Sequence, residues 1–301
     1  MIQKIQSDSI DIIDPLVITM REKIGKDVVP YNIGDTLKKS VTEGKNFLYG
    51  VFDEDDYLQG FGFWKGVSEG ISYVFSEDPE LETLLIDEIF RIHSIDCSTI
   101  MAAGPWVTES ISKHLIKIGF RELERAYMSV YRDANASLDY VNLPKNMNFE
   151  NYDEKYRIEV ASVIFKGNNG LIDQIVFPNF LGSVEKCVSL VKDIENSVYG
   201  TYMKPYSWIL KHDEKIIGAC FMTIHNDEGT GYIPDIVIDP DYQGQRLGKA
   251  ILVHSLKNLL EGESNIEKVS LDVTLENNAR YLYQSLGFTT VNEYSMYTWV
   301  K

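Results

Sequence analysis

The sequence predicts an α/β protein made of two similar domains in tandem. Its 301 residues are enough for two domains that each bury a core of their own. Two pairs of segments also resemble each other in the same order along the chain: 47–63 resembles 206–221, and 111–128 resembles 279–296. Chance similarity between amphipathic segments is the alternative explanation of these matches.

Each pair of matching segments predicts a particular element. The first pair follows the pattern strand, acidic turn, strand, which is typical of a β-hairpin. The second pair shares a Gly-Phe step, which begins at Gly119 in one segment and at Gly287 in the other. We therefore expect one domain at residues 1–140 and another at 146–301, joined through 133–137 and the following Leu-Pro-Lys-Asn stretch.

Residues 236–252 are the most informative segment of the second copy, because they indicate a strand, a glycine-bearing turn and an amphipathic helix. Gly244 and Gly248 let the chain bend and let a ligand approach the main chain. The apolar positions follow a helical spacing, with Gly262 as the expected stop: Leu247, Ala250, Ile251, Leu256, Leu259 and Leu260. Backbone N–H groups at such a helix start bind phosphate, whereas a purely structural turn is the alternative.

A second strand and helix follow about 40 residues later. Residues 268–273 alternate in polarity as a strand does, and 277–288 indicate a short capped helix. Gly287 and Phe288 are typical of a left-handed helix stop with an apolar contact behind it.

These elements resemble the Gcn5-related N-acetyltransferase (GNAT) family, which has a Gln/Arg-x-x-Gly-x-Gly/Ala loop and a later Asn…Ala-x-x-Leu-Tyr…Gly-Phe helix. Gln243 to Gly248 match the loop and Asn277 to Phe288 match the helix, in the family's order. Two departures stand out. Arg246 occupies the place of the first motif glycine, and Asn277 lies one residue closer to Tyr283 than usual. We expect right-handed helical geometry at Arg246, with its guanidinium near a phosphate.

The resemblance implies two tandem GNAT-like domains, each a mixed, mostly antiparallel sheet flanked by helices. It also implies that acetyl-CoA is the acetyl donor and that no metal is needed. The strand before the loop is expected to hold the pantetheine arm and the acetyl carbonyl through its backbone, and the loop to hold the pyrophosphate. The implied cofactor-binding residues are Ile236, Val237, Ile238, Gln243, Gly244, Gln245, Arg246, Leu247, Gly248, Lys249, Asn277 and Asn278. The two asparagines are alternatively helix caps only.

The resemblance assigns the role of general acid to Tyr283. A phenol with an ordinary pKa of about 10 stays protonated at neutral pH and can give its proton to a leaving thiolate. Tyr281 lies two residues away on the same helix, about 200° around it, so only one of the two can face the donor.

Asp235 is the candidate general base, because it is the carboxylate just upstream of the strand that holds the donor. Pro234 precedes it and indicates an irregular or edge strand, where side chains can be re-aimed. A strand-end carboxylate without a catalytic role is the alternative.

The first copy lacks the features that bind acetyl-CoA. It has no glycine between Gly70 and Gly104, and the stretch expected to hold its phosphate loop carries Glu77, Asp78, Glu80 and Glu82. Leu115 aligns with Tyr283, so the hydroxyl is absent. We expect this copy to be degenerate and non-catalytic, and to help enclose the acceptor. The remaining acceptor contacts are expected from residues 161–206.

Charge and cysteine content restrict the partners. The 45 acidic against 29 basic residues give a net charge of −16, which disfavours nucleic acids and anionic membranes and weakly favours a cationic acceptor. Cys97, Cys187 and Cys220 show no paired spacing, and no long apolar run is present, which indicates a soluble protein of a reducing cytoplasm. The histidines show no triad or metal spacing.

The sequence thus predicts a cytoplasmic N-acetyltransferase that moves an acetyl group to a primary amine of a small molecule or peptide by direct attack in a ternary complex. Two alternatives stay open. One is a non-catalytic acyl-CoA-binding regulatory protein, and the other is an acyltransferase that uses another donor.

Overall fold

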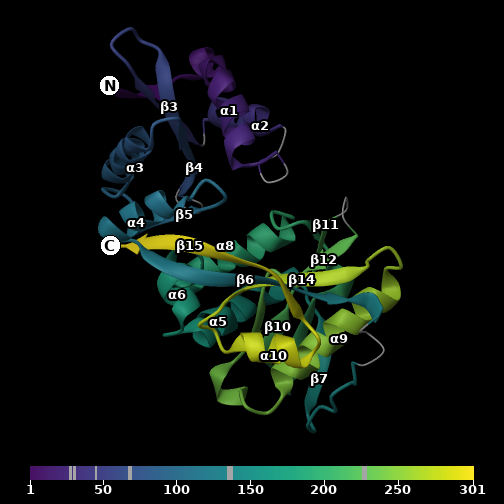
Figure 1. The fold of residues 1–301 in the computed structure, drawn as a ribbon. Coiled ribbons are helices and arrows are strands. Elements are labelled where there is room, and N and C mark those ends of the chain that lie inside the picture. Colours follow the sequence, from purple (N-terminus) through teal and green to yellow (C-terminus); the bar gives the residue numbers. More distant parts are fainter. Residues whose placement is uncertain (27–28, 30–31, 45, 67–69, 134–137, 226–228) are drawn as a thin grey trace. The chain divides into compact units, whose positions relative to one another are not determined.

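The computed structural model describes residues 1–26, 29, 32–44, 46–66, 70–133, 138–225 and 229–301. It has the predicted α/β fold of mixed sheets and helices, and it divides into two compact units (Figure 1). The N-terminal unit consists of Met1–Leu123 and Ser295–Lys301, and the C-terminal unit consists of Glu124–Tyr294.

The N-terminal unit contains a six-stranded sheet in the order β1-β2-β3-β4-β5-β15, in which β4 and β5 are parallel and the other pairs antiparallel. Its apolar cores lie between this sheet and the helices. Its elements are β1 (Ile2–Ile5), the 3-10 helix η1 (Ser7–Ile13), α1 (Asp14–Ile24), α2 (Ile33–Thr42), β2 (Phe47–Phe52), β3 (Leu58–Trp64), β4 (Ile71–Ser76), α3 (Pro79–His93), β5 (Thr99–Ala103) and α4 (Glu109–Lys117).

The C-terminal unit contains two sheets, β15-β6-β14-β12-β11-β8 and β13-β10-β9-β7. The described residues of this unit form two apolar cores. Helix α9 belongs to one, together with residues of both sheets, and α5 and α8 belong to the other, together with residues of β9 and β10. Its elements are β7 (Met147–Asn151), η3 (Glu154–Tyr156), α5 (Arg157–Asn168), α6 (Ile172–Val176), α7 (Pro178–Leu181), α8 (Val184–Glu195), β8 (Thr201–Tyr202), η4 (Lys204–Tyr206), β9 (Trp208–His212), β10 (Lys215–Cys220), β11 (Thr223–His225), β12 (Thr230–Tyr232), β13 (Ile236–Ile238), η5 (Pro240–Tyr242), α9 (Leu247–Gly262), β14 (Lys268–Thr274) and α10 (Ala279–Ser285).

Two long strands, β6 (Arg121–Tyr131) and β15 (Thr289–Val300), pass from one unit into the other. The later residues of β6 pair with β14 in the C-terminal unit, whereas Met296–Val300 of β15 pair with β5 in the N-terminal unit. The compact units therefore exchange strand segments relative to the predicted boundaries of 1–140 and 146–301. Of the predicted connection at 133–137, residues 134–137 lie outside the described residues.

The repeated motifs adopt the predicted local structures in both units. β2 and β3 form an antiparallel hairpin, and so do β9 and β10. After α4 and after α10 the chain turns through Gly119 (φ 100°) and Gly287 (φ 86°). The N–H of Phe120 donates to the carbonyl of Leu115, and that of Phe288 donates to the carbonyl of Tyr283. The same turn geometry at both places supports the tandem repeat.

Two strands of the C-terminal unit, β13 and β14, separate after Pro234. β12 and β14 run parallel and pair up to Tyr232 and Ser270, and the N–H of Ile233 donates to the carbonyl of Ser270. Beyond Pro234 the chain turns away, and β13 pairs with β10 instead. The predicted irregularity at Pro234 is therefore present, and the strand after it leaves β14.

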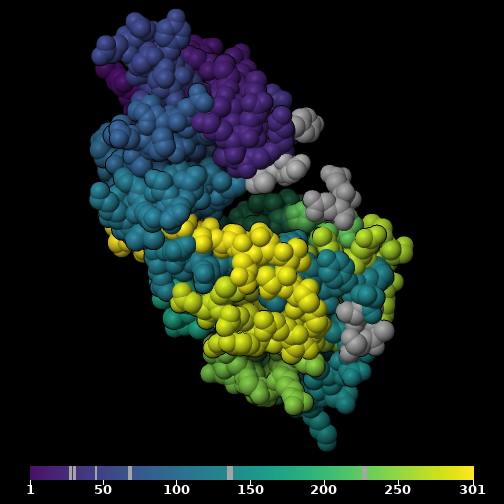
Figure 2. Space-filling model, viewed as in Figure 1, coloured from purple at the N-terminus to yellow at the C-terminus, as the bar shows by residue number. Residues whose placement is uncertain are grey.

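The remaining features concern the surface. Residues 289–293 of β15 are exposed, and the yellow C-terminal residues form part of the visible face in Figure 2. Among the helices of the described residues, none is both long and apolar enough to cross a membrane.

Candidate active site

The loop before α9 presents a row of unused backbone donors. In the described part of the chain, no hydrogen bond is donated by the N–H groups of the six residues from Gly244 to Lys249. The first turn of α9 holds no acidic side chain. Gly244 has φ 76°, and no atom lies within 4 Å of the place where its Cβ would be. These N–H groups and the helix dipole form a site for an anion such as a phosphate.

Arg246 does not have the right-handed geometry that we expected from the sequence. Its φ of 62° and ψ of 14° are left-handed, at the residue that immediately precedes α9. The expectation was wrong because this position turns the chain into the helix, which is the reason for a glycine there in the family motif. A left-handed conformation costs a residue with a Cβ about 1–2 kcal/mol.

The strain at Arg246 leads to a test. Arg246→Gly should raise the free energy of unfolding by about 0.5–1 kcal/mol, because the relieved strain exceeds the added entropy of the unfolded chain. Arg246→Ala keeps the Cβ and should give no such gain. Urea midpoints of the three proteins measure this, and equal midpoints for glycine and alanine would contradict the assignment of strain.

The corresponding helix of the N-terminal unit is closed to anions by its own side chains. The Asp78 carboxylate accepts a hydrogen bond from the N–H of Glu80 at 2.9 Å, and Glu82 accepts one from the N–H of Ser76 at 3.3 Å. Burial raises the pKa of Glu82. The start of α3 is thus capped by acidic groups, whereas the start of α9 is not.

The backbone of β13 offers two residues to a ligand. The N–H of Asp239 donates a hydrogen bond to the carbonyl of Ile217, and the carbonyl of Asp235 accepts one from the N–H of Phe221. These backbone groups of Asp235 and Asp239 therefore face β10. Because alternate residues of a strand share a direction, Val237 also faces β10, whereas the backbone groups of Ile236 and Ile238 face the gap left by β14. The side-chain amide of Gln243 donates to the carbonyl of Ile238 at 3.1 Å.

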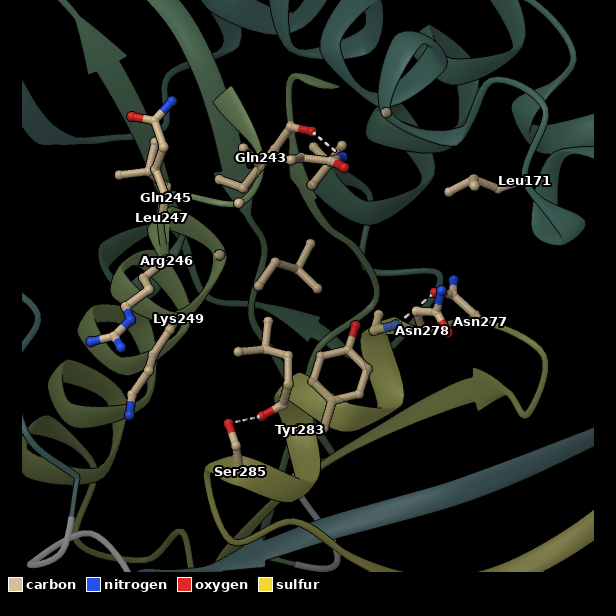
Figure 3. Close-up of a pocket in the computed structure, with 18 of the residues that line it drawn as sticks. Leu171, Gln243, Gln245, Arg246, Leu247, Lys249, Asn277, Asn278, Tyr283 and Ser285 are labelled. Atoms are coloured by element: carbon tan, nitrogen blue, oxygen red, sulfur yellow. Dashed lines mark hydrogen bonds between the residues drawn. The ribbon is translucent and has the colours of Figure 1, made fainter. Parts of the chain in front are cut away.

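A pocket of about 1400 Å³ lies in the C-terminal unit between this loop, β13 and the start of α10 (Figure 3). It is lined by all twelve residues that the sequence predicted to bind the donor, and by Tyr283. Asp235 does not line it. The sequence missed the segment Asp139–Asn142, which carries no motif, and included Gly167–Ile172 only within a broad acceptor region.

Tyr283, not Tyr281, faces this pocket. The side chain of Tyr283 is 7% exposed and its phenol points into the pocket in Figure 3, whereas Tyr281 is 55% exposed and packs on Arg280. Burial, together with the negative charge of Asp235, raises the pKa of Tyr283. The phenol is therefore protonated at neutral pH and suited to donate a proton.

Asp235 lies in the turn between β12 and β13 and is half-buried. Its Oδ1 atom has no hydrogen-bond partner among the described residues. Burial and the nearby Asp173 carboxylate raise its pKa to about 7. A carboxylate with such a pKa exchanges protons near neutral pH, which is what a general base requires.

Asp173 of α6 joins the site through hydrogen bonds that no sequence pattern indicated. Its carboxylate accepts from the Thr274 hydroxyl at 2.6 Å and from the Asn277 side-chain amide. The side-chain Oδ1 of Asn277 accepts a hydrogen bond from the N–H of Ala279 at 2.8 Å, at the first residue of α10. The side chain of Asn277 therefore caps the helix, and that of Asn278 makes no capping bond.

The possible metal ligands and the histidines were predicted to form no metal site or triad. Within the described ranges, no three residues among His, Cys, Asp and Glu come together in a way that would hold a metal ion. His254 is stacked on Phe149, with ring centroids 4.2 Å apart, and His212 lies 3.2 Å from the Tyr242 hydroxyl.

A model of the acetyltransferase (GNAT) domain matches residues 204–290, which include β13, the loop, α9 and α10. The chain carries an acetyltransferase domain of the GNAT family. This domain therefore contains the loop, the split between β13 and β14, and Tyr283. No protein with curated functional information matches the sequence.

Solved GNAT structures have the same fold over the whole chain. A GCN5-related N-acetyltransferase from Sphaerobacter thermophilus matches with a TM-score of 0.64 and 13% identity, over 100% of this chain and 95% of the other. A tandem GNAT protein from the clavulanic acid biosynthesis pathway matches with a TM-score of 0.60 and 11% identity, over 100% and 98%. A glucosamine N-acetyltransferase region of a fungal multi-domain enzyme matches with a TM-score of 0.61 and 14% identity. This match covers 99% of this chain and 38% of the other.

Proposed function

We propose that the protein is an acetyl-CoA-dependent N-acetyltransferase whose C-terminal unit acetylates a primary amine of a small molecule or peptide. The observation that supports this proposal most is at the start of α9, inside the GNAT domain, where the backbone N–H groups of six consecutive described residues donate no hydrogen bond. GNAT proteins use acyl-CoA donors, and these N–H groups suit the pyrophosphate of such a donor. The N-terminal unit is non-catalytic, because carboxylates cap the corresponding helix.

The proposed mechanism is direct attack within a ternary complex. Ile236 and Ile238 hold the pantetheine arm and the acetyl carbonyl through their backbone groups. Asp235 takes a proton from the acceptor ammonium, directly or through water, and the free amine attacks the thioester carbon. When the carbon–sulfur bond breaks, Tyr283 gives its proton to the departing sulfur, and its phenolate then takes up the second proton that the nitrogen releases, directly or through water.

Thermal unfolding with and without acetyl-CoA tests donor binding. At 100 times the dissociation constant, a ligand stabilises the folded state by about 2.7 kcal/mol, which raises the melting temperature visibly. A screen of amines for CoA release then tests turnover. No thermal shift at millimolar acetyl-CoA would refute the proposal. Binding without CoA release for any amine would favour a regulatory acyl-CoA-binding protein.

The pKa of Asp235 predicts the pH dependence of turnover. Only the ionised carboxylate accepts a proton, so kcat/KM for the amine should rise about tenfold per pH unit below pH 7 and level off above it. Asp235→Asn should lower kcat/KM and remove this limb of the profile. An unchanged profile in Asp235→Asn would exclude Asp235 as the base.

A further inference from the structure

The two faces of β14 in the C-terminal unit differ in character. Val269, Leu271 and Val273 belong to the core under α9, so the residues between them face the other way. In the register with β6, Arg125 lies opposite Thr274 on that second face. We call this second face the polar face, and its main residues are Arg125, Tyr232, Ser270, Asp272, Thr274 and Tyr294.

The carboxylate on the polar face already has partners. Asp272 accepts hydrogen bonds from the Tyr232 hydroxyl at 3.0 Å and from the Tyr294 hydroxyl at 2.7 Å. Both oxygens are thereby occupied by neutral donors. Asp272 does not form an ion pair with Arg125 in the described part of the chain.

The guanidinium of Arg125 has spare donors. It is half-buried, it donates to the Thr274 hydroxyl at a long 3.4 Å and interacts with the Tyr294 hydroxyl, and its central carbon lies 5.0 Å from the centroid of the Phe177 ring. Among the described residues, no carboxylate lies within ion-pair distance of it. Arg157 of the same unit, by contrast, pairs with Glu195 at 2.6 Å. A half-buried charge that no carboxylate contacts directly is costly, so an anion from a ligand would stabilise it.

Hydrogen bonds connect Arg125 to the pocket. Thr274, which accepts from Arg125, donates to Asp173, and Asp173 also accepts from Asn277, which lines the pocket at the start of α10. The charge of Asp173 in turn acts on Asp235 and on Tyr283. Arg125 does not itself line the pocket, but this network joins its positive charge to the negative charges of Asp173 and Asp235. A molecule that carries both charges would match this arrangement.

We propose that Arg125 binds a carboxylate of the acceptor, and that the acceptor is an amino-acid-type small molecule whose amine is directed to Asp235. This inference rests on the proposed acetyltransferase function. The planar guanidinium matches a carboxylate through two parallel hydrogen bonds, and the Phe177 ring holds its plane. A zwitterion also has no net charge, so the overall charge of −16 does not repel it.

The test compares matched acceptors and variants. The acceptors are β-alanine and γ-aminobutyrate, the common α-amino acids, and the primary carboxamide of each. Turnover is followed by CoA release with wild type, Arg125→Gln, Arg125→Lys and the control Arg91→Gln, which removes an exposed arginine of the N-terminal unit. Binding is followed separately by the melting temperature with CoA and each acceptor present.

We expect wild type to prefer acids over their amides by about 10- to 100-fold in kcat/KM, which is the effect of one charge-assisted pair. Arg125→Gln should bring this ratio close to one because it raises the KM of the acid acceptors. The KM of acetyl-CoA should stay unchanged. Arg125→Lys should give an intermediate ratio, and Arg91→Gln the wild-type ratio.

Several outcomes would overturn the inference. If wild type acetylates amides as well as acids, or if Arg125→Gln keeps the preference, Arg125 does not bind the acceptor while the acetyltransferase function stands. If acetyl-CoA binds but no acid raises the melting temperature or releases CoA, the acceptor is not of this class. If acetyl-CoA does not bind, the proposed function fails and the inference falls with it.

Discussion

Replacing Tyr283 with phenylalanine is expected to lower kcat about 10- to 1000-fold, with the affinity for acetyl-CoA unchanged. The phenol is buried at the pocket and protonated, so its loss leaves the departing sulfur without a proton donor. The ring packs beside Phe288, with centroids 5.9 Å apart, and phenylalanine keeps that packing. The effect should therefore be on chemistry and not on folding.

Tyr281→Phe is the matched control. It removes the same hydroxyl two residues earlier on α10, where the side chain is exposed and packs on Arg280. Its kcat should equal that of wild type. Steady-state CoA release gives kcat for both variants, and the thermal shift gives donor binding. Wild-type turnover in Tyr283→Phe would remove Tyr283 from the mechanism.

The residues that the sequence predicted to bind the donor lie together around one pocket because they belong to local patterns. A strand, a glycine-bearing turn and a helix lie within 236–252, and the capped helix at 277–288 is equally local. All twelve predicted donor residues line the pocket for this reason. Val237 lines it with its backbone turned to β10, which depends on strand pairing that the sequence does not display.

The parts that the sequence did not predict depend on distant contacts or on backbone strain. Asp173 meets Thr274 and Asn277, residues that are 101 and 104 positions away, and no local pattern indicates such pairs. The pairing of β6 with β14 and of β15 with β5 also joins distant segments, and the sequences of β6 and β15 do not indicate which strands they pair with. The geometry at Arg246 was misjudged although the resemblance places a glycine there, because a residue with a Cβ rarely adopts a left-handed conformation.

The two units show how one repeat can gain or lose a ligand site through a few residues. The turns after α4 and α10 have the same hydrogen bonds, but Leu115 is found where the other unit has Tyr283. The carboxylate of Asp78 takes the place that an anion would occupy at the start of α3. Local charge at the helix start, rather than the fold, therefore distinguishes the units.

Replacing Gly248 with glutamate is expected to weaken acetyl-CoA binding at least 100-fold. Gly248 lies in the first turn of α9 among the unused N–H groups, so a carboxylate there competes for them and repels pyrophosphate. A Cβ at this position would lie 3.3 Å from Leu282 Cδ2, which requires only a small shift of that side chain. Isothermal calorimetry with acetyl-CoA measures the loss.

A series at position 248 separates the charge from the bulk. Gly248→Ala adds only the Cβ and should bind acetyl-CoA within a few-fold of wild type, whereas Gly248→Gln has the size of glutamate without the charge and should fall in between. If glutamate and glutamine weaken binding equally, steric exclusion alone explains the effect and the helix-start electrostatics are not needed. If glutamate binds as wild type does, the donor lies elsewhere, because a carboxylate among those N–H groups cannot coexist with pyrophosphate. The order alanine, glutamine, glutamate in rising dissociation constant would locate the pyrophosphate at the start of α9.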